Sequence, residues 1–316
     1  MSMVRIGNSE LEIFPLGLGG NTFGNTTDER ASMEVLDAFV AAGGNFIDTA
    51  DSYSHWKPGN RGGESETILG EWMRQRGNRG QVVMATKVGG MPGLKGLSPD
   101  IIARAADDSL RRLGTDYIDL YYAHHDDPAV PVPEIATAFD ALVRAGKVRY
   151  VAISNLAPER IDEWMRVARE NGLALPVALQ PQYSLVSRQK YESTFAPVAE
   201  KHGLAVFPYF ALASGFLTGK YRTQADLEGA ARGGAVAPYL NADGLRVVDA
   251  LQSIAESRGA AIATVALAWV LAKPTITAPL ASATRLPQLA ELMAVPALHL
   301  TEEEVAALDQ ASQPFA

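Results

Sequence analysis

Hydrophobic residues along the chain follow two alternating patterns. Short apolar runs typical of buried strands recur at 16–20, 46–47, 82–87, 118–124, 150–155, 177–180, 205–209 and 275–280. Apolar residues at helical spacing occupy most of the intervals between and after them, at 35–40, 66–76, 98–113, 133–145, 158–171, 191–202, 245–258, 262–271, 286–293 and 301–310. About eight strands separated by helices, in a chain of 316 residues, predict a (β/α)8 TIM barrel of the α/β class.

A doubly wound open sheet is the rival architecture for this alternation. It carries a Gly-x-Gly-x-x-Gly fingerprint after the first strand, and here Gly17, Gly19, Gly20 and Gly24 are spaced differently. The barrel is therefore the preferred fold. Ahead of it, residues 4–13 alternate about a Gly-Asn-Ser turn, which predicts an N-terminal β-hairpin at the bottom of the barrel.

A Gly- and Ala-rich interval at 214–242 interrupts the alternation. A loop of this length in a compact domain is commonly a functional lid, so we expect it beside the active site. The loops at 54–63, 126–133 and 220–242 should select the substrate. Candidate pocket walls, each equally well explained as a packed loop anchor, are Trp56, Tyr239, Tyr121 and Tyr122.

Composition narrows the class of protein. With 47% hydrophobic residues and no break in composition, the chain is expected to form a single domain over 1–316. Its net charge of −8 argues against nucleic acid or an anionic membrane as a partner. The absence of cysteine excludes disulfides and thiolate chemistry and fits a reducing compartment. No signal peptide or spanning segment is recognisable, so we expect a cytoplasmic protein, with no obligate protein partner evident.

Four side chains with useful chemistry stand at the ends of predicted strands. Asp48 and Tyr53 follow the strand at 46–47, Lys87 ends the strand at 82–87, and His124 ends the strand at 118–124. Each alone is better explained by a structural role. In a barrel, however, the carboxyl ends of the strands meet at one mouth, so the four should converge there.

Such a set is suited to proton donation. A buried lysine ammonium next to a tyrosine stabilises the phenolate, which should lower the pKa of Tyr53 toward neutrality, and Asp48 would keep Lys87 charged. A neutral His124 could orient a carbonyl oxygen and stabilise the oxyanion that forms when hydride arrives. None of the four is a hydride donor, so a nicotinamide cofactor is expected.

A metal site is the competing interpretation, because His124 and His125 precede Asp126 and Asp127. Adjacent residues in a strand point to opposite faces, so the two histidines should not both reach one ion. The remaining histidines show no ligand spacing, and we expect no metal.

The chain resembles the aldo-keto reductase family over nearly everything from Val4 to Leu292, in particular its bacterial-type branch, which is similar to potassium channel β subunits. The motifs that carry the resemblance are Phe46-Ile-Asp-Thr-Ala-Asp-Ser-Tyr53, Ala85-Thr-Lys87, Asp119-Leu-Tyr-Tyr-Ala-His124 and Leu142-Val-Arg-Ala-Gly-Lys-Val-Arg-Tyr-Val-Ala-Ile-Ser-Asn155. The family's catalytic tetrad carries over to Asp48, Tyr53, Lys87 and His124. The resemblance implies the same barrel and carbonyl reduction.

The resemblance also implies cofactor contacts. Those expected near the nicotinamide are Gly20, Thr22, Phe23, Asp48, Ser154, Asn155, Gln180 and the stacking ring of Tyr209. The loop expected to pass over the pyrophosphate is the run 212–219, which includes Leu212, Gly215 and Leu217, and Phe210 and Ala211 are also expected to contact the cofactor. Those expected at the adenosine 2′-phosphate are Ser282, Thr284, Arg285 and Gln288.

Arg285 favours NADPH over NADH, although a solvated arginine at a helix start is the plain alternative. Two departures from the family's pattern weaken the NADP assignment without touching the tetrad. The family often has Tyr-Ser-Pro-Leu where this chain has Tyr-Phe-Ala-Leu at 209–212, and Leu292 replaces an asparagine often found near the adenine.

Three functions follow, in descending order of support. The first is an NADPH-dependent reductase of small-molecule aldehydes or ketones. The second is an NADPH-binding regulatory subunit with slow turnover, similar to the β subunits of voltage-gated potassium channels. The third is a metal-dependent barrel hydrolase.

Overall fold

The computed structural model describes residues 2–230 and 232–316. Met1 and Ala231, which belong to the predicted single domain and, for Ala231, to the predicted lid, lie outside the described residues. Eight parallel strands form one sheet in the order β10-β3-β4-β5-β6-β7-β8-β9. Their bounds are β3 Gly17–Gly19, β4 Phe46–Asp48, β5 Val83–Val88, β6 Ile118–Ala123, β7 Val148–Ser154, β8 Pro176–Gln180, β9 Ala205–Val206 and β10 Leu280–Ala281.

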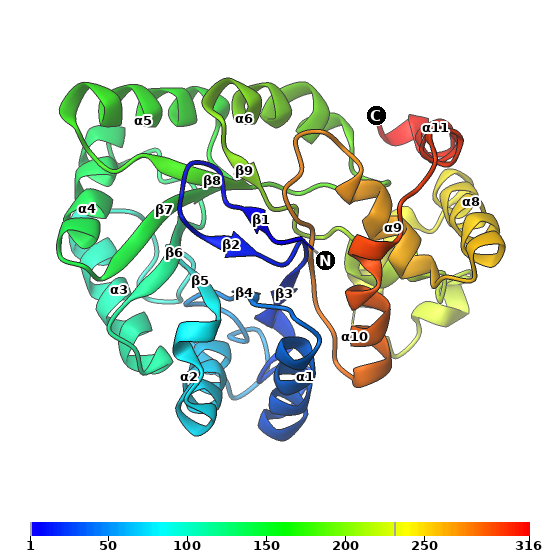
Figure 1. The fold of residues 1–316 in the computed structure, drawn as a ribbon, viewed down its shortest axis with the longest axis horizontal. Coiled ribbons are helices and arrows are strands. Elements are labelled where there is room, and N and C mark those ends of the chain that lie inside the picture. The colour runs from blue at the N-terminus through cyan, green and yellow to red at the C-terminus, as the bar shows by residue number, and fades with distance from the viewer. Residues whose placement is uncertain (1, 231) are drawn as a thin grey trace.

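Backbone hydrogen bonds close this sheet into a barrel. Thr277 N donates to Val206 O at 3.0 Å, and Leu280 N donates to Pro208 O at 2.9 Å, which joins the β9 segment to the approach of β10. Helices surround the closed ring of strands (Figure 1). The predicted (β/α)8 TIM barrel is confirmed.

The helices follow the strands as the hydrophobic pattern predicted, except that the short helix Gly233–Val236 lies inside the interval 214–242 that was expected to be a loop. They are α1 Glu29–Ala41, α2 Glu64–Arg76, α3 Pro99–Leu113, α4 Val132–Arg144, α5 Pro158–Asn171, α6 Ala196–His202, α7 Gly233–Val236, α8 Ala242–Arg258, α9 Ile262–Leu271, α10 Leu286–Met293 and α11 Glu302–Ala311. In α3, Ser98 is the N-cap, Pro99 is the first helical residue, and Gly114 ends the helix with φ 63°. A residue with a side chain is strained at that φ, which explains why glycine stands there.

Most predicted boundaries shift by one or two residues, and three elements differ more. The strand expected at 275–280 is confined to Leu280–Ala281, and the strand expected at 205–209 ends at Val206. Pro208 and Pro279 stand at these places, and proline has no N–H to donate to a ladder. The helix expected at 191–202 opens with a π-helical turn over Tyr191–Phe195 before α6 begins.

The N-terminal hairpin covers the bottom of the barrel. Strands β1 (Val4–Arg5) and β2 (Glu12–Ile13) pair antiparallel. Ile6, Leu11 and Ile13 pack into one apolar cluster with side chains of the barrel interior. Phe14 N bonds Asn45 Oδ1, just before β4, at 2.8 Å. The hairpin lies across the ring of strands in Figure 1, so its predicted position is confirmed.

Alternation along the strands separates two apolar layers. On β6, Tyr122 belongs to the barrel interior, and Tyr121 belongs to the larger cluster between the sheet and the helices. Across the described residues, no single helix has the length and apolar character to cross a membrane. Only α8 and α9 taken together, bent by 101°, pass that test.

Candidate active site

The strand ends bring the four predicted residues to one mouth of the barrel. Asp48 is the last residue of β4, and Lys87 is the last but one of β5. His124 directly follows β6, and Tyr53 lies in the loop after β4. The register pairs Asp48 with Ala85 and Lys87 with Tyr122, so neighbouring strands end at the same level.

Lys87 is the hub of this cluster. Its ammonium donates to Asp48 Oδ2 at 2.6 Å, to the Thr49 carbonyl at 2.7 Å and to the Tyr53 hydroxyl oxygen at 3.1 Å. The lysine side chain is fully buried, and Asp48 is 2% exposed. Three acceptors satisfy the three N–H groups of the ammonium, which fixes the distance between the lysine charge and the phenol.

Burial and charge compete over the proton equilibria of the cluster. Burial alone would lower the pKa of Lys87, but Asp48 and Tyr53 outweigh it and raise that pKa, so the lysine stays charged as predicted. For Tyr53 the prediction was wrong in direction. Burial raises the pKa of its phenol, and the Lys87 charge offsets this only in part, because Asp48 adds a negative charge that also raises it.

His124 completes the mouth as a neutral imidazole. Burial and the nearby Lys87 charge, helped by His125, hold the pKa of His124 well below its ordinary value. Its ring stands edge-on to the Tyr53 ring, with centroids 6.1 Å apart. Its backbone carbonyl accepts from Asn155 Nδ2 at 3.0 Å. The histidine can therefore donate one N–H toward the mouth without carrying charge.

The two adjacent histidines do not point apart, contrary to expectation. The rings of His124 and His125 stack with centroids 4.3 Å apart and planes 16° apart. Strand β6 ends at Ala123, so strand alternation no longer applies to this pair. Within 2–230 and 232–316, no three His, Asp or Glu side chains gather as metal ligands would.

The residues proposed to hold the nicotinamide form a chain of hydrogen bonds that begins at Asp48. Gln180 Nε2 donates to Asp48 Oδ1 at 2.8 Å, and Ser154 Oγ donates to the Gln180 carbonyl at 2.9 Å. Asn155 Nδ2 donates to Ser154 Oγ at 3.0 Å, and the Tyr209 hydroxyl donates to Asn155 Oδ1 at 2.8 Å. These four polar side chains share one network with Asp48.

The proposed loop contacts on the other side of the mouth are packed around glycines. Thr22 and Phe23 are both buried in the structure without a ligand. A Cβ added to Gly20 would lie 2.8 Å from Ser65 Oγ, so no other residue fits there without displacing that side chain.

The segment from 210 to 215 is strained. Phe210, Ala213 and Ser214 are not glycines, yet they have φ values of 53°, 46° and 58°, and Gly215 follows at 96°. Left-handed backbone costs a residue with a side chain about 1–2 kcal/mol. Strain of this kind concentrates where backbone is shaped around a ligand. Leu212 and Leu217 of the predicted pyrophosphate loop lie in and beside this segment, as does Ala211, another predicted cofactor contact.

The proposed 2′-phosphate residues lie between β10 and α10. Arg285 is the exposed N-cap residue of α10. Thr284 donates through its backbone N and its Oγ1 to Gln288 Oε1, both at 2.9 Å, and Ser282 Oγ donates to Asn21 Oδ1 at 2.8 Å. No carboxylate among the described residues forms an ion pair with Arg285.

The sequence analysis did not identify three residues that lie at the barrel mouth: Thr49, Asp51 and Gly90. The Thr49 carbonyl is a ligand of the Lys87 ammonium. Asp51, 1% exposed, has no hydrogen-bond partner for either carboxylate oxygen among the described residues. Gly90 lies against Ser52 and His124. A signal was present for the last, because two glycines directly after a strand indicate a close backbone approach.

The predicted aromatic walls separate into two groups. Trp56 is 48% exposed, and its ring centroid lies 6.0 Å from that of Tyr53, so it remains a candidate wall. Tyr239 packs on Phe216 at 5.9 Å. Tyr121 and Tyr122 are both fully buried, so they are core residues and not walls.

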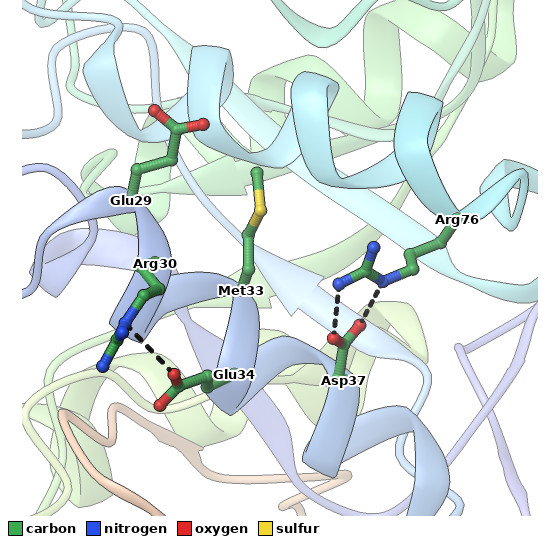
Figure 2. A pocket seen from close by; sticks show the side chains of 6 residues that line it. All are labelled: Glu29, Arg30, Met33, Glu34, Asp37 and Arg76. Carbon is green, nitrogen blue, oxygen red and sulfur yellow. Dashed lines mark hydrogen bonds and ion pairs between the residues drawn. The ribbon is translucent and has the colours of Figure 1, made fainter.

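A surface hollow on the outside of the barrel lies apart from this mouth. It sits between α1 and α2 and is lined by Glu29, Arg30, Met33, Glu34, Asp37 and Arg76. Figure 2 shows its charges pairing with one another, Arg76 with Asp37 at 2.8 Å and Arg30 with Glu34 at 3.4 Å. Such paired, solvated charges form a polar surface groove and offer no reactive group.

Comparison with known proteins identifies the family. The model of the aldo/keto reductase family matches residues 15–313. The chain belongs to this family. Its members named as reductases support an oxidoreductase acting on carbonyl compounds, with NAD(P)H as the general cofactor of the family.

Curated relatives cover nearly the whole chain. A probable voltage-gated potassium channel subunit beta from Oryza sativa subsp. japonica is 35% identical, over 93% of this chain and 90% of the rice protein. The uncharacterized oxidoreductase YrpG of Bacillus subtilis is 34% identical, over 96% and 93% respectively. Norsolorinic acid reductase B of Aspergillus parasiticus is 33% identical, over 96% of this chain and 82% of the fungal protein.

Proposed function

We propose that this protein is an NADPH-dependent oxidoreductase that reduces the carbonyl group of a small aldehyde or ketone to an alcohol, with Tyr53 as the proton donor. The observation that carries the proposal is the Lys87 ammonium, which bonds Asp48 and Tyr53 at once. A fully buried lysine held against a phenol by a carboxylate is costly to build. Its evident use is to stabilise the phenolate that remains when Tyr53 gives up its proton.

The residues at the mouth fit a nicotinamide cofactor. Gln180, Ser154, Asn155 and Tyr209 offer amide and hydroxyl groups for a carboxamide, and the Tyr209 ring offers a planar surface. The left-handed backbone at 213–215 suits a backbone approach to phosphate. When bound, the cofactor supplies the hydride.

The chain's own residues handle the proton and the developing charge. The Tyr53 hydroxyl donates a hydrogen bond to the carbonyl oxygen and transfers its proton as negative charge grows there. Lys87 stabilises the phenolate left behind, and Asp48 keeps Lys87 protonated. His124, neutral, donates from Nε2 to the same oxygen and fixes its direction. The reverse path oxidises an alcohol.

Preference for NADPH rests on Arg285. A guanidinium bonds phosphate oxygens in bidentate fashion, and this one is exposed at the start of α10 beside Thr284. The 2′-phosphate is the group that separates NADPH from NADH, so Arg285 is the side chain on which discrimination depends.

The test is NADPH oxidation by the purified protein with a panel of aldehydes, ketones and dicarbonyls, with Tyr53→Phe as the matched variant. We expect turnover in the wild type and a loss of at least a hundredfold in kcat in the variant, because general acid catalysis contributes about 10²–10⁴-fold. Binding of NADPH should change little, which fluorescence titration checks. Equal rates in the two proteins would overturn the assignment of Tyr53.

A second function is favoured by one specific finding, the similarity to plant proteins named as probable potassium channel β subunits. In that case the protein binds NADPH tightly, turns it over slowly and acts through a protein partner. The same assay separates the two functions. Sustained consumption of NADPH supports the reductase, and retained cofactor with negligible turnover across the panel supports the regulatory subunit.

A further inference from the structure

The two ring nitrogens of His124 have different surroundings. Nδ1 is buried and has no hydrogen-bond partner among the described residues, whereas Nε2 is not enclosed in this way. A neutral imidazole carries its proton on one nitrogen and a lone pair on the other. For Nε2 to donate to a carbonyl oxygen, Nδ1 must hold the lone pair, and a buried lone pair needs a donor.

Ser52 and Gly90 border this nitrogen. A Cβ built on Gly90 would lie 3.2 Å from His124 Nδ1 and 2.7 Å from Ser52 Oγ, so both atoms face the bare Cα of the glycine. Ser52 is 5% exposed. Any larger residue at 90 would push the serine hydroxyl or the imidazole aside, which accounts for glycine at this position.

The serine hydroxyl is also the uncommitted one in its loop. Thr49 Oγ1 donates to Ser65 Oγ at 2.8 Å, and Ser54 Oγ donates to the Phe23 carbonyl at 2.7 Å. The Ser52 hydroxyl takes no part in the hydrogen bonds among the described residues, although its backbone carbonyl contacts His55 Nδ1 at 2.8 Å. The hydroxyl of a largely buried serine and a buried ring nitrogen therefore both border the Cα of Gly90, and neither has a hydrogen-bond partner among the described residues.

We propose that Ser52 is a positioning residue whose hydroxyl donates to His124 Nδ1, by rotation of the serine side chain or through one water, and so keeps the histidine proton on Nε2. The inference rests on the proposed role of His124 in carbonyl reduction. In the other tautomer the Nε2 lone pair would face the carbonyl oxygen and repel it, so the tautomer decides whether His124 assists or opposes the reaction.

The test measures the tautomer directly, by ¹⁵N NMR of histidine-labelled protein without substrate. We expect the Nε2–H form in the wild type and a shift toward a mixture of both forms in Ser52→Ala. Ser52→Thr, which keeps the hydroxyl, should restore the wild-type spectrum. Ser54→Ala, which removes a neighbouring hydroxyl committed elsewhere, should leave the His124 tautomer unchanged. An unchanged His124 spectrum in Ser52→Ala would overturn the proposal.

Kinetics then link the tautomer to catalysis. In Ser52→Ala, kcat should fall about fivefold to tenfold, the effect of one lost hydrogen bond, while NADPH affinity stays constant. Gly90→Ala should act in the same direction by crowding the hydroxyl. The NMR result is independent of turnover, so a tautomer shift in a protein that reduces no carbonyl would contradict the proposed function and leave the role of Ser52 standing.

Discussion

Two parts of the barrel mouth, called here the buried side and the open side, differ in how far their charges are buried and paired. On one side, Asp48, Tyr53 and Lys87 are locked together by short hydrogen bonds around a fully buried ammonium. On the other side, Arg285 is exposed at the start of a helix and has no ion-pair partner among the described residues. The first arrangement is complete in the protein alone, and for the second we propose that a ligand brings the opposite charge.

This difference separates chemistry from recognition. Groups that must transfer a proton have to be held within tenths of an ångström, and burial with full hydrogen bonding achieves that. A group that selects a ligand gains from meeting it in solvent, because an exposed guanidinium loses little hydration before the phosphate arrives. Substitutions on the buried side should therefore affect both stability and turnover, and substitutions on the open side should affect ligand affinity alone.

The largest effect is expected from Lys87→Met. The variant leaves Asp48 buried without its cation, and an uncompensated buried charge costs about 3–5 kcal/mol of unfolding free energy. Turnover should fall at least a hundredfold, because the Tyr53 phenolate loses its stabilising charge. Urea denaturation and the NADPH oxidation assay measure the two effects.

A matched control for that variant is Lys273→Met. Lys273 also pairs with a carboxylate, Asp309, at 2.6 Å, but it lies far along the chain from the tetrad and is partly exposed. The Lys273→Met variant should lose about 1 kcal/mol or less of unfolding free energy and keep the turnover of the wild type. If the two lysine variants behaved alike, the buried cluster would have no special role, and the contrast between the two sides would fail.

A smaller effect is expected from pH at Asp51, which lies behind the buried side. Burial, together with the charge of Glu66, raises the pKa of Asp51 to about 7, and Arg112 only partly opposes this. The folded protein thus binds a proton that the unfolded chain, with an ordinary pKa of 3.8, releases at lower pH. The stability contributed by this group is then greatest below pH 3.8, falls as pH rises from 3.8 to about 7, and stays constant above that.

Asp51→Asn checks that sign. The variant cannot ionise, so its unfolding free energy should lose this dependence on pH and exceed that of the wild type at pH 8 by about 4 kcal/mol, the equivalent of about three pKa units. Denaturation at pH 5, 6.5 and 8 measures it. A wild type that grows more stable between pH 5 and 8 by an amount that the variant does not share would contradict the prediction.

The contrast between the two sides also explains what the sequence could reveal. Periodicity predicted the barrel, and the strand ends placed Asp48, Lys87 and His124 together, because parallel strands ending at one level leave little freedom. Sequence could not weigh burial against charge at Tyr53, since both depend on how the barrel closes around it. The stacking of His125 on His124 was missed because β6 ends one residue earlier than assumed.

The sequence also could not predict contacts between residues that are far apart in the chain and carry no recognisable motif. Ser52 and His124 both border the bare Cα of Gly90, and the charges that act on Asp51 come from Glu66 on α2 and Arg112 on α3. The extent of a single domain over 1–316, the cytoplasmic location and the individual site residues stay predictions, which the experiments proposed for Tyr53, Ser52, Lys87, Asp51 and Arg285 address in part.

The smallest effect, and the one confined to the open side, is expected from Arg285→Gln. Losing a bidentate contact to phosphate should weaken NADPH binding about tenfold, close to 1.4 kcal/mol, because hydrogen bonds to charged groups contribute about 1.5–3 kcal/mol. NADH lacks the 2′-phosphate, so its affinity and the kcat at saturating cofactor should not change. Arg30→Gln is the control, since Arg30 is also exposed and, among the described residues, its ion pair is with Glu34 in the groove on α1. An equal loss of affinity for NADPH and NADH would show that Arg285 stabilises the loop and does not bind the phosphate. The open side would then have a structural role, as the buried side does.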